Sequence, residues 1–373
     1  MKNIYFKNSK GWAGVTAVTC GREEEVGVAS LDESDGCLHI AIDNDISMLT
    51  IHGDNGQRTG RVFPGALSIG VDYRYNDKLN RDLTYLWSKD ISRTGRVENH
   101  LISDPENLWY REDKSKRISV FLPESYDGVT PHDLLYFFDA QNLFCLAGDY
   151  TENSDPYGSW QLDLVVSEIR RQFGKNIVVV GIDNADMYRS NELFMDPDKF
   201  GDLSPLATAI PEDNFSKGYL ESLSAFMVQT LHSFIKENYC ISEENIGLGG
   251  SSMGGIASFF CGLHEKGFYK YVISYSPAFG LYEMNAFDKW FGKLNFEGNR
   301  DILPKIHIYC GGGDQLEMSL LPASMDMKPL LVKHGYSEDK IYETYDMEKP
   351  HNEESWRLVL PESFSCLMNL FNL

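Results

Sequence analysis

The sequence predicts an α/β domain with a mostly parallel sheet, preceded by a small all-β domain. From about residue 117 onward, apolar runs alternate with long amphipathic helical stretches, which is typical of a parallel sheet covered by helices on both faces. Before residue 65 the apolar runs are short, often alternating and separated by turns, as in antiparallel β-structure. We therefore expect a β-sandwich at residues 1–65, a connecting segment at 66–98 and the α/β domain at 99–373.

The elements follow from the periodicity of each segment. In the first domain the runs NIYFKN, AGVTAVTC, CLHIAID and ISMLTIHG predict strands, and in the connecting segment LNRDLTYLWSKDI is expected as a short helix. In the α/β domain, strands are expected at 118–123, 133–140, 176–183, 245–250, 269–277, 305–312 and 341–347. Helices are expected at 161–173 and 219–239, and the stretch after residue 252 is also helical in pattern.

Composition excludes several classes of partner. The 373 residues are 42% hydrophobic, enough for a large core, and carry a formal charge of -21. This charge disfavours nucleic acid and anionic membranes. The N-terminus lacks the pattern of a secretory signal, and the seven cysteines form no CxxC pair, so we expect a cytoplasmic protein with reduced thiols.

The stretch NIGLGGSSMGGIASF contains two neighbouring serines between a predicted strand and a predicted helix. Ser252 has glycines two residues before and after it, which is the G-x-S-x-G pattern of a nucleophile elbow. Ser251 fails this spacing, because Met253 stands two residues after it, and we expect its hydroxyl to cap the helix. Ser252 is therefore the candidate nucleophile, although glycine-rich turns of this kind also serve packing alone.

A serine nucleophile needs a base, and the base needs a carboxylate to orient it. In this architecture the acid and then the base follow the serine, each after a later strand. KIHIYCGGGDQLE places Asp314 after its strand, with Glu317 as the alternative acid. Among the nine histidines, His351 lies in the loop that follows the last predicted strand. It is therefore the candidate base.

The tetrahedral intermediate of such a reaction needs hydrogen-bond donors for its oxyanion. We expect one from the backbone N–H of Met253, at the start of the helix. The second should come from the loop after the strand at 133–140, and Gln141 is the preferred donor. Asn142, in the same loop, is a candidate substrate-binding residue.

Several motifs in order resemble the esterase group of α/β-hydrolases that includes esterase D, enterochelin esterase and the family 1 carbohydrate esterases. LYFFDAQNLF is similar to the group's "DGQN-LF" strand and loop, with Ala140 in place of the usual glycine. The other matching segments are VVVGIDNADMYRSNEL, GLGGSSMGG, CGGGDQLE and KPHNEESW, and together they cover about residues 95–373.

This resemblance implies an α/β-hydrolase fold, Ser252 as nucleophile, His351 as base and Asp314 as its orienting acid. It implies no metal and no organic cofactor. Arg189 and Glu192 match the group's R-x-x-E motif, which ties down a loop in one interpretation and touches substrate in the other. Both residues are therefore candidates for substrate binding.

The first 65 residues separately resemble a starch-binding module of the family 25 and 26 type, through IYFKNSKGW and ISMLTIHGDNGQRTG. Aligned on Gly11 and Trp12, the positions that carry sugar-stacking aromatic rings in that family fall on Val18 and Cys20, which have no flat face. We therefore expect a module that binds starch weakly or not at all. Its role would then be to pack on the hydrolase domain, wall the substrate cleft or form an oligomer interface.

These observations predict a serine carboxylesterase that acts on a small-molecule or oligosaccharide ester of acetyl or feruloyl type. One alternative is a siderophore esterase or acyltransferase with the same triad. The other is a carbohydrate-binding protein without catalysis. Partners other than the substrate are not expected to include nucleic acid or membrane, and the sequence leaves a homo-oligomer open.

Overall fold

The computed structural model describes residues 1–21, 26–30, 32–34, 36–88, 90–92, 94–144, 157–208 and 217–372. The chain divides into two compact units. Unit 1 contains residues 1–96, 142–176 and 352–373, and unit 2 contains residues 97–141 and 177–351. The six cysteines among the described residues are free thiols, and Cys145 lies outside the described residues.

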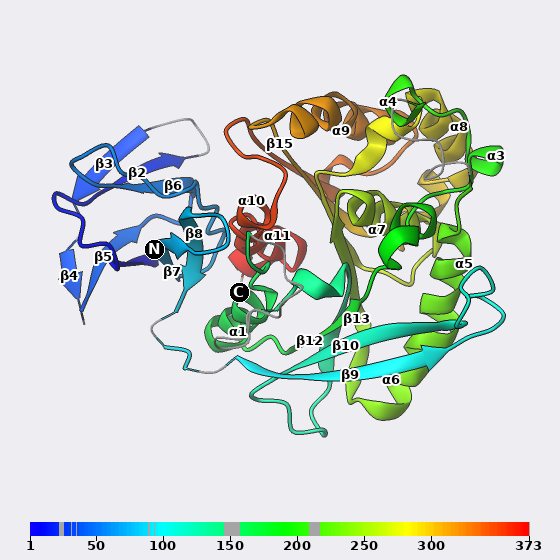
Figure 1. Cartoon of the computed structure of the whole chain (residues 1–373), viewed down its shortest axis with the longest axis horizontal. Helices are drawn as coiled ribbons and strands as arrows, with labels where there is room; N and C mark the ends of the chain where they lie inside the picture. The colour runs from blue at the N-terminus through cyan, green and yellow to red at the C-terminus, as the bar shows by residue number, and fades with distance from the viewer. Residues whose placement is uncertain are drawn as a thin grey trace. The chain divides into compact units, whose positions relative to one another are not determined.

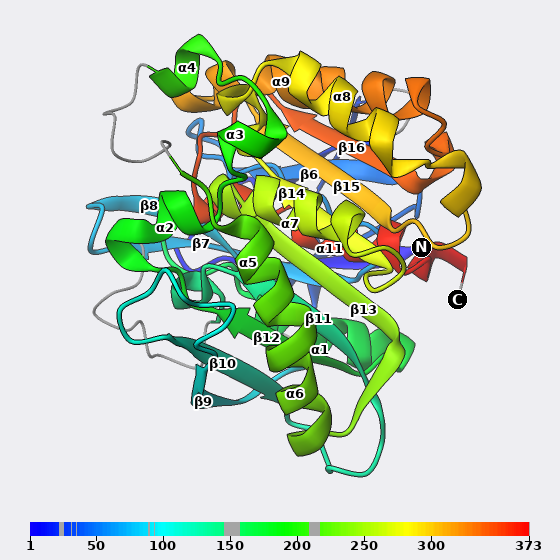
Figure 2. The same ribbon diagram turned by 90° about the vertical axis from the view of Figure 1, so that its right-hand side faces the viewer.

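Unit 2 is built on an eight-stranded sheet with the order β16-β15-β14-β13-β11-β12-β10-β9 (Figures 1 and 2). From β12 to β16 the neighbouring strands are parallel, whereas β10 pairs antiparallel with β12. The strands are β9 (Gly95–Ser103), β10 (Ser115–Pro123), β11 (His132–Phe138), β12 (Ile177–Ile182), β13 (Ile241–Ser251), β14 (Tyr271–Tyr275), β15 (Lys305–Gly311) and β16 (Ile341–Asp346).

The central strands are buried along their length, as is typical of the inner strands of a parallel sheet. All six residues of β12, IVVVGI, and all five of β14, YVISY, are buried. The seven strands predicted in this domain are confirmed. In a parallel sheet the carboxyl ends of neighbouring strands meet at one edge, so the loops after β13, β14, β15 and β16 lie at the same edge of the sheet.

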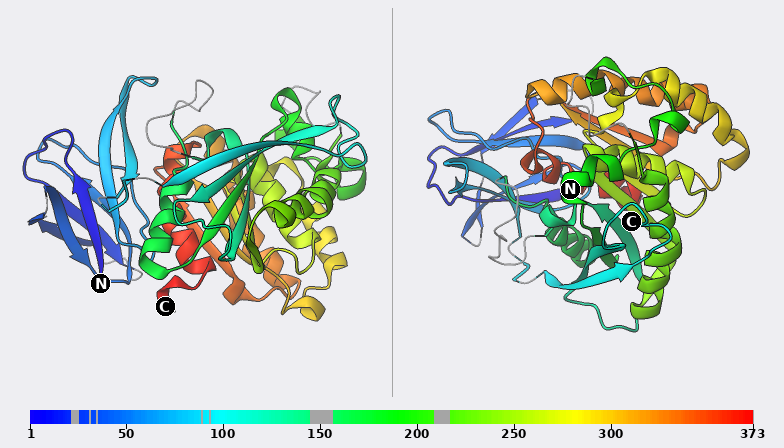
Figure 3. Two further views of the ribbon diagram at one scale, coloured as in Figure 1. Left: turned by 90° about the horizontal axis from the view of Figure 1, so that it is seen from below. Right: turned by 45° about the vertical axis from the view of Figure 1, so that its right-hand side comes forward.

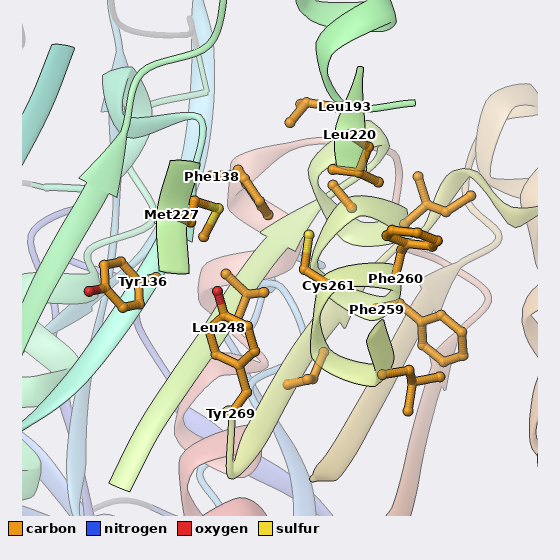
Figure 4. Close-up of a cluster of buried hydrophobic side chains, with 14 of the residues drawn as sticks. Tyr136, Phe138, Leu193, Leu220, Met227, Leu248, Phe259, Phe260, Cys261 and Tyr269 are labelled. Atoms are coloured by element: carbon orange, nitrogen blue, oxygen red, sulfur yellow. The ribbon is translucent and has the colours of Figure 1, made fainter. Parts of the chain in front are cut away.

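Helices of unit 2 cover one face of this sheet, as Figure 2 shows for α5 to α9. Their apolar side chains form a single core with the strands, and Figure 4 shows part of it around Leu248 and Phe259. The helices are α2 (Arg189–Glu192), α3 (Pro197–Phe200), α4 (Pro205–Thr208), α5 (Leu220–Ala225), α6 (His232–Asn238), α7 (Met253–His264), α8 (Met284–Leu294) and α9 (Gln315–Lys333).

The helix predicted over 219–239 is confirmed, with one irregularity. Its middle, η4 (Phe226–Leu231), is π-helical and joins α5 to α6. Short turns elsewhere are η1 (Ala140–Asn142), η2 (Asp186–Tyr188), η5 (Ala278–Leu281), η6 (Glu297–Asn299), η7 (Glu338–Lys340) and η8 (Leu370–Asn372).

Unit 1 begins with two β-sheets, which are coloured blue in Figures 1 and 3. One has five strands in the order β4-β5-β1-β7-β8, and the other has three in the order β3-β2-β6. The strands are β1 (Lys2–Lys7), β2 (Thr16–Gly21), β3 (Val26–Ser30), β4 (Asp32–Ser34), β5 (Cys37–Ile42), β6 (Ile46–His52), β7 (Ile69–Asn76) and β8 (Arg81–Trp87).

The segment 66–98 is not the connection that the sequence suggested. It contains β7 and β8, and β7 pairs in parallel with β1 at the middle of the five-stranded sheet. The expected short helix in LNRDLTYLWSKDI is therefore wrong. The run DLTYLW is rich in residues that favour strands, and pairing with β7 decides its conformation. The boundary at residue 65 would cut this sheet in two.

Trp12 lies in the core of this β-region. It is 7% exposed and its ring lies against Phe6 and Tyr73, at 5.3 and 5.1 Å between centroids. It does not offer an open face for sugar stacking. Val18 and Cys20 are neighbours on β2, so the strand that should carry a platform has no aromatic side chain at these positions.

Unit 1 also contains three helices from later in the chain: α1 (Leu162–Phe173), α10 (Glu353–Arg357) and α11 (Leu360–Leu367). The helix predicted at 161–173 is thus confirmed as α1. Arg357 of α10 is fully buried and donates to the carbonyl of Thr84 in β8 from both Nε, at 2.9 Å, and Nη2, at 2.6 Å. Arg357 therefore links the C-terminal helix α10 to strand β8 within this unit.

Candidate active site

Ser252 lies at a sharp turn between β13 and α7. Its backbone has φ 57° and ψ -120°, a conformation that costs free energy for a residue with a side chain. A Cβ on Gly250 would lie 2.5 Å from the carbonyl oxygen of Gly254, and a Cβ on Gly254 would lie 2.9 Å from Oδ2 of Asp139. The glycines of G-x-S-x-G are therefore needed because the turn brings backbone and neighbouring side chains too close for any Cβ.

Ser251 has a structural role. It is the last residue of β13, where it pairs with Tyr275 of β14, and it is buried. The N-cap residue of α7 is Ser252, and its side chain makes no cap hydrogen bond. The expectation that Ser251 caps the helix is thus wrong, because the extended strand continues through this residue.

The end of β14 holds the elbow on its other side. The N–H of Ser252 donates to the carbonyl of Tyr275 at 2.9 Å, and the N–H of Ala278 donates to the carbonyl of Ser252 at 3.1 Å. Between them, Ser276 has φ 40° and is fully buried, and its hydroxyl donates to Oε1 of Glu317 at 2.5 Å. One strand end therefore connects the serine turn to a buried carboxylate.

That carboxylate, and not Asp314, faces the histidine. Nδ1 of His351 lies 3.1 Å from Oε1 of Glu317. Asp314 instead accepts the backbone N–H of His351 at 2.7 Å and, through its other oxygen, the N–H of Glu317 at 2.8 Å. The expectation that Asp314 orients the imidazole is corrected: the alternative acid, Glu317, occupies that position.

Glu317 is fully buried and well supplied with donors. Besides Ser276 and His351, its Oε2 accepts the N–H of Gly311 at 3.1 Å and lies 3.1 Å from Sγ of Cys310. A buried carboxylate is tolerated when its oxygens are hydrogen-bonded in this way. The same burial raises the pKa of the Cys310 thiol, so this group stays protonated as a donor.

The three glycines before Asp314 allow the histidine loop to approach. The N–H groups of Gly312 and Gly313 both donate to the carbonyl of Lys349, at 3.2 and 2.8 Å. A Cβ on Gly311 would lie 2.2 Å from that same carbonyl oxygen. The glycines of CGGGD therefore let the loop that carries His351 pack closely against this segment.

The sequence contained a signal for these two roles. D-Q-L-E places a residue with a strong N-cap preference three positions before a glutamate at the start of a helix. In the structure Asp314 is indeed the N-cap of α9, and its side chain accepts the N–H of Glu317. In a full capping box Glu317 would reach back to the N-cap, but here it turns to His351 instead.

The loop after β11 is tied down by Arg189. Asp139 has φ 60°, and its carboxylate accepts Nε of Arg189 at 2.6 Å, Nη2 of Arg189 at 2.8 Å and Nδ2 of Asn184 at 3.0 Å. Burial opposes the charged form, but Arg189 and the other donors outweigh it and the pKa of Asp139 is lowered. Asp139 therefore stays ionised and holds the turn just before Ala140 and Gln141.

Glu192, the other residue of the R-x-x-E motif, is fully buried. Its carboxylate forms an ion pair with Nζ of Lys116 on β10 and accepts the hydroxyl of Tyr110 at 3.0 Å. Burial lowers the pKa of Lys116 despite this partner. Glu192 has no exposed surface with which to touch a substrate, so its assignment as substrate-binding is corrected. α2 is thus anchored by Glu192 and holds the loop at Asp139 through Arg189.

The remaining predicted residues occupy the expected segments. Met253 is the first residue of α7, where backbone N–H groups have no acceptor within the helix. Gln141 lies in η1, and its Oε1 is buried without a hydrogen-bond partner among the described residues. Asn142 belongs to unit 1, where its amide donates to Glu353 at 3.0 Å.

Other histidines have structural surroundings. His307, inside β15, is buried, and this burial lowers its pKa to about 3, so it stays neutral beside the hydroxyl of Thr344 at 3.0 Å. His232 contacts Tyr136 and Glu243 from α6. Across the described ranges, no group of three or more His, Cys, Asp or Glu residues could hold a metal ion. None of the helices in the described part of the chain has the length and apolarity to cross a membrane.

Known proteins share the family and the fold of this chain. The family model described as "Putative esterase" matches residues 112–365. No curated protein sequence matches the chain. Among solved structures, the BES protein from Bacillus cereus aligns with a TM-score of 0.54 at 14% identity, covering 75% of this chain and 98% of its own.

Two further structures show the same fold. An IroE-like serine hydrolase from Shewanella oneidensis has a TM-score of 0.52 at 12% identity, covering 72% of this chain and 79% of its own. The siderophore hydrolase EstA from Aspergillus nidulans has a TM-score of 0.52 at 13% identity, covering 77% of this chain and 97% of its own. With more than half of its length matched by the family model, the chain belongs to the esterase family and is a hydrolase with the α/β-hydrolase fold.

Proposed function

We propose that this protein is a serine carboxylesterase with Ser252 as nucleophile, His351 as general base and Glu317 as the orienting acid. The observation that carries the proposal is the chain of hydrogen bonds at one sheet edge. It runs from the strained Ser252 through the end of β14 to Glu317, and from Glu317 to Nδ1 of His351.

The pairing with Glu317 assigns the two ring nitrogens of His351. Nδ1 donates its hydrogen to the carboxylate, which leaves Nε2 unprotonated and able to accept the proton of the Ser252 hydroxyl. The carboxylate then stabilises the imidazolium. Because Glu317 is buried and bound by four donors, it does not move during this proton transfer.

The reaction follows in two halves. Oγ of Ser252 attacks the ester carbonyl, and the oxyanion is stabilised by the N–H groups of Met253 and Gln141. His351 returns the proton to the leaving alcohol, which departs and leaves an acyl group on Ser252. Water then attacks this acyl-enzyme with His351 as base, and the acid product is released.

For the substrate we propose an acetyl or feruloyl ester of a carbohydrate or a related small molecule. The strong negative charge of the chain, -21, favours uncharged esters over phosphorylated ones. A second candidate is a siderophore ester, because the siderophore hydrolase EstA shares this fold. Transfer of the acyl group to a sugar alcohol would use the same site.

A panel of esters tests the proposal. We expect the purified chain to hydrolyse p-nitrophenyl acetate and to be labelled at Ser252 by a fluorophosphonate, and Ser252→Ala to abolish both. The matched control is Ser251→Ala, which should remain active because Ser251 is the buried end of β13. An unchanged rate in Ser252→Ala would exclude this site. The candidate substrates are then separated by comparing hydrolysis of acetylated xylan, methyl ferulate and a catecholate trilactone. Each assay is repeated with an alcohol acceptor to detect acyl transfer.

A further inference from the structure

A pocket of about 200 Å³ opens within unit 1, on one face of the five-stranded sheet. Its lining includes Lys7 of β1, Asp72 and Arg74 of β7, Tyr85 and Trp87 of β8, and Gln161 just before α1. The register explains how they meet: Lys7 pairs with Asp72, Asp72 pairs with Tyr85, and alternate residues of a strand share a face.

Asp72 is the unusual member of this pocket. It is only 4% exposed, and its Oδ1 has no hydrogen-bond partner among the residues that the structure describes. A buried carboxylate without donors destabilises a fold by several kcal/mol, so such groups are retained mainly where they bind something. Because Asp72 lines the pocket, a ligand there can reach the carboxylate.

The walls of the pocket are fixed in advance. The side-chain amide of Gln161 bridges to Leu86 twice, accepting its N–H at 2.8 Å and donating to its carbonyl at 3.0 Å. Thr94 donates to Asp163 of α1 at 2.9 Å. The guanidinium of Arg74 lies 4.3 Å above the ring of Tyr85. The backbone and the Gln161 side of the pocket are therefore held in place before a ligand enters.

The chemistry of the lining selects the ligand. Trp87 is half-buried, and the ammonium of the exposed Lys7 lies 5.7 Å from its ring centroid, so a ligand that stacks on this face displaces the lysine side chain. Asp72 is on the same side of the sheet. A cationic ligand would pair with Asp72, but the pocket already contains the positive charges of Lys7 and Arg74. A molecule that combines hydroxyl donors with a flat apolar face satisfies both the carboxylate and the indole.

We propose that this pocket binds one pyranose residue of a sugar, with a ring hydroxyl donating to Asp72 and the ring face lying on Trp87. The pocket is smaller than the ~300–1,000 Å³ typical of drug-sized sites, which suits one sugar ring rather than a wound polysaccharide. This site is separate from the positions Val18 and Cys20 on β2, and it does not depend on the ester chemistry proposed above.

Ligand-observed saturation-transfer NMR on the full chain tests this site. The probes are methyl β-glucopyranoside, methyl β-xylopyranoside, methyl α-galactopyranoside and N-acetylglucosamine, with choline as the cationic comparison. We expect at least one sugar to bind, and Asp72→Asn and Trp87→Ala each to weaken it at least tenfold, with Trp87→Phe as the milder variant should alanine disturb folding. Asp77→Asn and Trp109→Ala, both at exposed positions outside the pocket, should bind as the original chain does.

Two further measurements keep the result specific. Hydrolysis of p-nitrophenyl acetate should be unchanged in Asp72→Asn, and Ser252→Ala should still bind the sugar, which separates this pocket from the catalytic serine. The melting temperature of Asp72→Asn should stay level or rise, since a buried unpaired charge is removed. The proposal is overturned if choline binds and no sugar does, if no sugar binds at millimolar concentration, if binding survives both pocket variants, or if Asp72→Asn lowers the melting temperature by several degrees.

Discussion

At the scale of single residues, the structure separates two carboxylates that lie three positions apart. Glu317 lies against the imidazole of His351, whereas Asp314 holds the backbone of His351 and caps α9. Both shape the position of His351, but in the mechanism proposed above only Glu317 stabilises the charge on the imidazole. This difference has a direct test.

We expect Glu317→Gln to lower kcat on p-nitrophenyl acetate by on the order of 10³–10⁴-fold, because the amide can hold the wrong tautomer of the histidine. Asp314→Asn is the matched control. Asparagine is also a good N-cap and keeps an acceptor, so this variant should keep most of its kcat. If Asp314→Asn instead loses most of its kcat while Glu317→Gln keeps a near-normal kcat, Asp314 is the orienting acid.

At the scale of elements, the short helix α2 connects the core to the loop after β11, which holds the proposed oxyanion donor. Glu192 fixes it to Lys116 on β10, and Arg189 holds Asp139 in its left-handed conformation. Neither residue needs to touch a substrate for the motif to matter. We regard Arg189 as a positioning residue for the loop that contains Gln141.

Arg189→Met should therefore lower kcat by roughly 10- to 100-fold with little change in KM, less than the ~10²–10³-fold loss of a whole oxyanion donor. The double variant Asp139→Asn with Arg189→Met should recover part of the loss, because no buried charge is left unpaired. Arg117→Met on β10 is the control, since Arg117 is 71% exposed in its side chain. A large rise in KM in Arg189→Met would argue that Arg189 contacts substrate instead. The same conclusion would follow if the double variant recovered none of the lost kcat.

At the scale of the whole molecule, the β-region is not an independent appendage. Within unit 1, the buried Arg357 near the end of the chain donates to Thr84 and also to the carbonyl of Tyr157 at 2.8 Å. The N–H of Thr84 in turn donates to Glu354 at 2.8 Å. Residues separated by more than 250 positions thus complete one another's hydrogen bonds.

Deletion of residues 1–96 should consequently give an insoluble chain, or one whose melting temperature is several degrees lower, because Arg357 and Glu354 lose buried partners at about 1–3 kcal/mol each. Arg357→Leu in the full chain is the point-mutation counterpart, and it should be destabilised in the same direction. Differential scanning fluorimetry and gel filtration measure both. A deletion variant that melts like the full chain would show that the β-region is dispensable for folding.

Local patterns in the sequence were enough to predict the parallel sheet, the turn at Ser252 and the loop that carries His351. These depend on short-range patterns: apolar runs of six to nine residues, glycines two positions either side of Ser252, and the order of motifs along the chain. The glycines had to be there, because Gly250 and Gly254 face backbone and side-chain atoms within 3 Å of any added Cβ.

The choice of the carboxylate that meets His351, and the end of the β-region, depend instead on long-range contacts. Asp314 and Glu317 are both compatible with the sequence, and the choice depends on how the first turn of α9 faces a loop that is more than 30 residues away. Likewise, β7 joins the first sheet through a parallel pairing with β1 across more than 60 residues, which no local pattern reveals. Long-range pairing and helix orientation are set by packing of the whole chain, and this is why local periodicity could not supply them.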